Sequence, residues 1–188
     1  MNRVLFRKIH RKLAPIIFIP LLLSALTGII YRIGKSWFGM SSETADIFMV
    51  IHQGEYLGDQ IKPIYVLLLG LGLIGMIVSG FTMIRRFSSD RPPSAIDVRK
   101  IHRLLAPIFF LPLVVSALSG ISYRLGKSWL GMSSEQAEIF MTIHQGSYLG
   151  SLLKPIYVLL VGLGLLGLIA TGIKMLGWFR KNQGSKAL

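Results

Sequence analysis

The chain contains one apolar unit that occurs twice in tandem. Residues 7–83 align without a gap with residues 99–175, and about 54 of 77 aligned positions are identical. We therefore divide it into a first two-span repeat (1–86, core 7–83), a linker (87–98) and a second two-span repeat (99–188, core 99–175). Whatever fold one copy adopts, the other is expected to adopt as well.

Four long apolar stretches predict an integral membrane protein. Hydrophobic residues make up 52% of the chain, and the mean hydropathy is +0.60. Each stretch is long enough to cross roughly 30 Å of hydrocarbon at about 1.5 Å per residue. The stretches are residues 13–31, 63–84, 105–123 and 155–176. We expect an all-α fold of four transmembrane helices, produced by tandem duplication of a two-helix unit.

Cysteine is absent from the chain. Its absence excludes disulfides, thiolate metal sites, iron–sulfur clusters and covalent haem attachment through cysteine. The first apolar stretch is matched by an internal copy that could not be cleaved, so we expect a span there and no signal peptide.

The net charge of +13 predicts the orientation of the spans. Basic residues precede the first span, fill the central connection and follow the last span. The positive-inside rule therefore predicts that these segments, and with them both termini, lie in the cytoplasm. They are Arg3, Arg7, Lys8, Arg11, Lys12, Arg85, Arg86, Arg91, Arg99, Lys100, Arg103, Arg180, Lys181 and Lys186. Anionic lipid headgroups account for this charge, so we do not expect nucleic-acid binding. The Pro92–Pro93 pair marks the linker as an exposed cytoplasmic loop.

Each of the other two connections, which we expect outside, predicts a short amphipathic helix. Serine and acidic residues begin each segment and a glycine ends it. Apolar residues recur between those signals at three- and four-residue spacing. In the first copy they are Ala45, Ile47, Phe48 and Ile51, with His52 on the same side. We expect this helix to lie along the outer membrane surface, with Trp37 and Tyr56 as interfacial anchors.

The four histidines occupy matched positions in the two copies. His10 lies before the first span and His52 beyond it, so these two cannot share a ligand. Because both copies enter the membrane in the same direction, a pseudo-two-fold axis along the membrane normal pairs His10 with His102 inside and His52 with His144 outside. Two facing imidazoles are a ligand set for the iron of a b-type haem.

Glycines and basic residues accompany both histidine pairs. Glycine surfaces let a porphyrin or a neighbouring helix approach closely, and the candidates are Gly28, Gly80, Gly120 and Gly172. Basic side chains could bind haem propionates. The candidates are Arg7, Arg11, Arg99 and Arg103 inside, and Arg32, Lys35, Arg124 and Lys127 outside.

Simpler explanations exist for the same residues. A histidine at a membrane interface is often solvated, and glycine repeats are often helix-packing surfaces. A duplication also copies an unimportant histidine as faithfully as a ligand, so the repeat counts as one observation per half.

Two motifs resemble the PepSY-associated transmembrane family. The string RKIHR, followed by an apolar span ending in ALTG at residues 25–28, resembles the family's first helix. The string IHQGEYLG at residues 51–58, followed by KPIYVLLLGLGLIGMIVSGFTMIRR, is similar to its second helix. Both motifs recur in the second copy, at residues 99–120 and 143–175. The chain resembles a short form, because each outer connection is only about 30 residues long and leaves no room for the extramembrane PepSY regions of typical members.

This resemblance implies a four-helix core and, for members that act as ferric-siderophore reductases, two b-type haems that carry electrons across the membrane. By the same resemblance, His10, His52, His102 and His144 take the ligand role. No nucleotide-binding motif follows the spans, so flavin and NADPH would belong to a partner.

Two functional hypotheses follow. The first is a small dihaem b-type cytochrome with bis-histidine iron in a bacterial inner membrane or a thylakoid membrane, acting as a transmembrane oxidoreductase or electron-transfer component without substrate chemistry of its own. Its partners would be membrane lipids and an unidentified electron donor and acceptor, within a larger complex or a homo-oligomer. The second is an accessory or pigment-binding subunit of a respiratory or photosynthetic complex, without redox activity.

Overall fold

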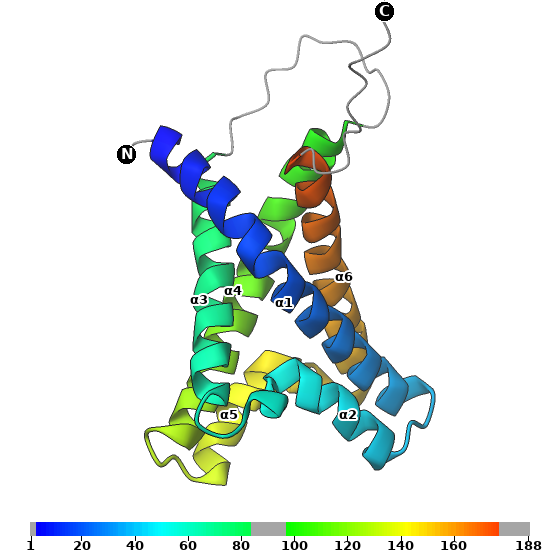
Figure 1. Cartoon of the computed structure of the whole chain (residues 1–188). Coiled ribbons are helices and arrows are strands. Elements are labelled where there is room, and N and C mark those ends of the chain that lie inside the picture. The colour runs from blue at the N-terminus through cyan, green and yellow to red at the C-terminus, as the bar shows by residue number, and fades with distance from the viewer. Residues whose placement is uncertain (1–2, 84–96, 177–188) are drawn as a thin grey trace, which may run out of the picture.

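The regular structure is entirely helical within residues 3–83 and 97–176, the part of the chain that the computed structural model describes. Four long helices form the bundle: α1 (Arg3–Trp37), α3 (Lys62–Phe81), α4 (Val98–Ser128) and α6 (Gly150–Leu176). Two shorter helices, α2 (Ser42–Gln53) and α5 (Ser134–Gln145), lie at the end of the bundle opposite the start of α1 and the end of α6 (Figure 1). Each is followed by a 3-10 turn, Glu55–Leu57 or Ser147–Leu149.

Each long helix is long and apolar enough to cross a membrane. The predictions of an all-helical fold and of four helices able to span a membrane are therefore confirmed for the described residues, and this indicates a multi-pass membrane protein. Helices α1 and α4 continue beyond the predicted spans at both ends, so His10 and His102 lie within them. The predicted end of the second span at residue 84 and most of the 87–98 linker lie outside the described residues. Asp97 is described and caps α4, because its carboxylate accepts the Arg99 N–H at 3.0 Å.

The long helices pack in a closed ring. Helix α1 contacts α3 and α6, and α4 contacts the same two helices. The buried core at the centre contains Ile17, Leu21, Leu73 and Ala117. Many other apolar side chains of the long helices are exposed on the bundle surface, as expected of side chains that face lipid.

The short helices have clear sequence-encoded ends. The Ser41 hydroxyl accepts the Thr44 N–H at 3.2 Å, which caps the start of α2. Gly54 ends α2 with a φ of +70°, a left-handed conformation that favours glycine. A Cβ atom there would also lie 2.5 Å from the Tyr65 ring, so this position requires glycine for space as well. Trp37 and Tyr56, the two residues expected to be interfacial anchors, are both exposed.

Candidate functional site

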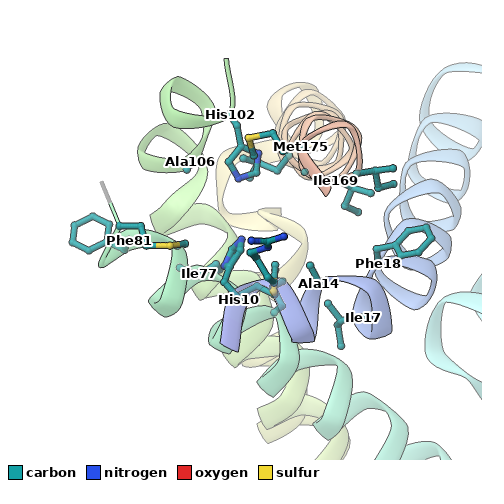
Figure 2. A pocket seen from close by; sticks show the side chains of 18 of the residues that line it. His10, Ala14, Ile17, Phe18, Ile77, Phe81, His102, Ala106, Ile169 and Met175 are labelled. Atoms are coloured by element: carbon teal, nitrogen blue, oxygen red, sulfur yellow. The ribbon is translucent and has the colours of Figure 1, made fainter. Parts of the chain in front are cut away.

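His10 and His102 line one cavity near the start of α1 and the end of α6, which we call the terminal site. Its volume is about 780 Å³, within the range usual for ligand pockets, and all four long helices contribute to its walls. Figure 2 shows both imidazoles at this cavity, His10 from α1 and His102 from α4. The lining is mostly apolar, and four of its members are the arginines Arg7, Arg11, Arg99 and Arg103.

The hydrogen bonds of the terminal site determine which imidazole nitrogen carries the proton. His10 Nδ1 lies 2.9 Å from Ser79 Oγ, and that hydroxyl donates its own hydrogen to the Gly75 carbonyl at 2.6 Å. The hydroxyl therefore accepts a hydrogen bond from Nδ1–H, which leaves Nε2 with a free lone pair. His102 Nδ1 lies 2.7 Å from Thr171 Oγ1, and that hydroxyl in turn donates to the Gly167 carbonyl. His102 therefore has the same tautomer as His10.

His52 and His144 lie together at the other end of the bundle, in what we call the short-helix site. Their ring centroids are 6.3 Å apart, with an angle of 61° between the ring planes. They line a cavity of about 220 Å³, together with residues from all four long helices. This volume is below the roughly 300 Å³ at which ligand pockets usually begin, so a large ligand here requires the lining side chains to move outward.

Backbone carbonyls fix the tautomer of this second pair. His52 Nδ1 lies 2.8 Å from the Ser24 carbonyl oxygen, and His144 Nδ1 lies 2.8 Å from the Ser116 carbonyl oxygen. A carbonyl only accepts, so each Nδ1 carries the hydrogen and each Nε2 keeps its lone pair. All four histidines thus present the nitrogen that a metal ion binds, held by a hydrogen bond on the opposite side of the ring.

Burial keeps the short-helix pair neutral. It lowers the pKa of His52 to about 4 from the usual 6.5, with the charge of the neighbouring His144 as the second cause. Burial also lowers the pKa of His144. Both imidazoles are therefore uncharged at neutral pH, which is the form that binds a metal.

The separation of these rings matches that of two imidazoles on one metal ion. If the two nitrogens lay on opposite sides of the ion, two metal–nitrogen bonds of about 2 Å and about 1 Å more from each nitrogen to its ring centre would place the centroids about 6 Å apart. The observed centroid separation of 6.3 Å agrees with this distance. A pair of histidines alone provides two ligands, and the described residues contain no group of three or more His, Cys, Asp or Glu side chains placed to bind a metal.

The four glycines singled out from the sequence each lie against a histidine. A Cβ atom on Gly28 would lie 3.1 Å from His52 Cε1, and one on Gly120 would lie 3.1 Å from His144 Cε1. At the terminal site the contacts are looser, 3.4 Å from Gly80 to His10 and 3.8 Å from Gly172 to His102. These glycines make room for the imidazoles, and the fit is tighter at the short-helix site.

The arginines expected near the second pair have partners that the sequence did not reveal. Arg32 donates to Gln145 Oε1, and Arg124 donates to Gln53 Oε1. Both arginines line the short-helix site and retain further N–H donors. The two lysines expected beside them bond elsewhere, since Lys35 donates to Ser42 and Lys127 donates to Ser134. Gln53 and Gln145 directly follow His52 and His144, and that adjacency was the only sequence signal.

Four leucines separate the two cavities. Leu21, Leu73, Leu113 and Leu165, one from each long helix, line both cavities and form the layer between them. The two sites therefore lie at opposite ends of the bundle. The layer between them consists of leucine side chains and contains no polar side chain.

Comparisons with models of known protein families, with curated protein sequences and with solved structures found no match.

Replacing Ser79 with alanine tests the hydrogen bond at the terminal site. Without the hydroxyl, Nδ1–H of His10 loses its acceptor and the imidazole becomes a weaker donor to a bound metal. In the haem-loaded protein we expect the midpoint potential of the terminal site to rise by tens of millivolts, with a similar rise for Thr171→Val. Thr82→Val is the control, because the Thr82 hydroxyl donates to the Ser79 carbonyl and not to a histidine of the described residues. Potentiometric titration gives the result, and unchanged potentials would contradict this role.

Proposed function

We propose that this protein is a dihaem b-type membrane cytochrome of the PepSY-associated transmembrane kind, which carries electrons between partners on opposite membrane faces. The observation that carries the proposal is the arrangement of its four histidines. They line two cavities, one near each end of a bundle of four long helices, and each imidazole has its Nδ1 hydrogen-bonded and its Nε2 unprotonated.

The residues present suit haem in several ways. His52 and His144 have the ring separation of a bis-histidine pair. The terminal cavity is large and mostly apolar, with arginines in its lining for propionate groups. Haem, when bound, would supply one-electron redox chemistry, while the chain supplies the axial nitrogens, their orientation and a water-poor interior.

The membrane face of each site follows from the charge distribution. We assign the terminal site to the cytoplasmic face, because Arg7, Arg11, Arg99 and Arg103 gather there. An acidic protein or an anionic small molecule suits this basic end as a partner. The duplicated sequence supports a pseudo-two-fold relation between halves, with the amphipathic short helices at the outer surface of a bacterial inner membrane or a thylakoid membrane.

Electron transfer across a sealed membrane tests this function. Purified protein loaded with haem is placed in vesicles that enclose ferricyanide, and a membrane-impermeant reductant is added outside. Haems near opposite faces of a roughly 30 Å hydrocarbon layer would have irons about 20 Å apart, so we expect the enclosed ferricyanide to be consumed at a rate proportional to the protein content.

The matched control carries His10→Ala and His52→Ala together, which removes one ligand from each site. Vesicles with this variant should consume ferricyanide no faster than empty ones. If the wild-type haems become reduced while the enclosed ferricyanide persists, transmembrane conduction is wrong, and an accessory role in a larger complex gains support.

A further inference from the structure

Two glutamines connect each short helix to the opposite half of the protein. Gln53 is the last residue of α2, and its side chain accepts a hydrogen bond from Arg124 of α4. Gln145 is the last residue of α5, and its side chain accepts a hydrogen bond from Arg32 of α1. The two bonds are reciprocal and join first-half residues to second-half residues in both directions.

The arginines in these bonds are themselves held in place. The Arg32 guanidinium lies 5.5 Å from the centre of the Tyr31 ring, and the Arg124 guanidinium lies 5.9 Å from the centre of the Tyr123 ring. Stacking on an aromatic face fixes the orientation of a guanidinium group. Each glutamine therefore bonds to a group with a defined direction, set by a long helix of the bundle.

The short helices otherwise pack mostly within their own halves. Helix α2 contacts mainly α1, while α5 contacts α4 and α6. Other hydrogen bonds of the short helices also stay within one half, such as the bond from Lys35 to Ser42. The gap between His52 and His144, however, spans the two halves. The long helices join the two halves through α1 with α6 and α3 with α4, and the glutamine bonds add a direct link from each short helix to the opposite half. Each glutamine also lies next in sequence to one of the histidines.

We infer that Gln53 and Gln145 are positioning residues, which with Arg32 and Arg124 hold the short helices at the separation that places His52 and His144 on either side of one metal ion. His10 and His102 belong to long helices of the ring and are positioned by the bundle itself. The inference rests on the proposed function for the identity of the metal centre, whereas the positioning can be measured without haem.

The absence of cysteine makes a direct distance measurement practical. Cysteines introduced by Ile47→Cys and Ile139→Cys, at positions 59% and 63% exposed on α2 and α5, would carry one spin label each. Pulsed electron spin resonance on the haem-free full chain should give a narrow distribution of distances between the labels. In the background of Gln53→Leu with Gln145→Leu, we expect that distribution to become roughly twofold broader, because both acceptors are lost.

Conservative and matched variants separate positioning from general damage. Gln53→Glu with Gln145→Glu keeps an oxygen acceptor for each arginine and should restore the narrow distribution. Lys35→Met with Lys127→Met removes bonds that stay within one half and should leave it unchanged. If the double leucine variant does not fold, Gln53→Leu alone should produce a smaller broadening. An unchanged distribution in a folded leucine variant would overturn the inference.

A second readout examines the consequence for the metal centre. In haem-loaded protein, the leucine variants should shift the low-spin electron spin resonance signal of the short-helix haem, leave that of the terminal haem unchanged, and regain the original signal with glutamate. A broadened distance distribution with unshifted haem signals would overturn the role at the metal. If the chain binds no haem at all, the proposed function fails while the distance measurement still decides the role of the glutamines.

Discussion

Replacing His52 with alanine should remove about half of the bound haem and leave the rest unchanged. Each proposed haem takes one histidine from each half, and the leucine layer separates the two sites. His144→Ala should have the same effect, whereas His10→Ala or His102→Ala should remove the other half. Haem content per chain, measured together with the visible spectrum of each variant, gives the result.

The four variants act as controls for one another, because each site has two ligands and should respond equally to the loss of either. Circular dichroism would establish that each variant retains its helices. Loss of both haems from a single folded variant would contradict two independent sites, and so would loss of neither.

Replacing Gly28 or Gly120 with leucine should abolish haem binding at the short-helix site. A Cβ atom added at either position would lie 3.1 Å from an imidazole carbon, so the larger leucine side chain must push the histidine away from its carbonyl partner. We expect a cost of about 1–3 kcal/mol in stability as well, measured as a lower melting temperature. Leucine at Gly80 or Gly172 should reduce haem at the terminal site less severely, because those contacts are looser.

Gly75→Ala provides the control for this series. Its Cβ atom would meet Leu13 at 3.4 Å, which is an ordinary packing distance, and would not touch a histidine. This variant should keep both haems and its melting temperature. Normal spectra and normal melting in all four leucine variants would show that these glycines are incidental to the histidines.

The helices could be predicted from the sequence because their signals are local. Apolar length predicted the four spans, and the serine and glycine at either end predicted the bounds of α2. The extension of α1 through His10 was missed, because charged residues there shorten the apolar stretch without ending the helix. Pro15 and Pro20 do not end it either, since a membrane helix tolerates interior prolines.

The details of the candidate site could not be predicted in the same way. The duplication suggested which histidines to pair, but the partner of each Nδ1 depends on how the helices are rotated against one another. Ser79 and Thr171 offer hydroxyls to the terminal pair, whereas backbone carbonyls serve the short-helix pair. The bonds of Gln53 and Gln145 to arginines distant in sequence depend on the same packing.

A reduced-minus-oxidised visible spectrum of the purified full chain shows whether the four histidines bind two haems. Expression with an adequate haem supply, followed by extraction of the cofactor, would give its identity and amount. We expect b-type absorption bands and about two non-covalent haems per chain. A folded protein that shows no haem bands, or that carries chlorophyll instead of haem, would contradict haem binding by the four histidines.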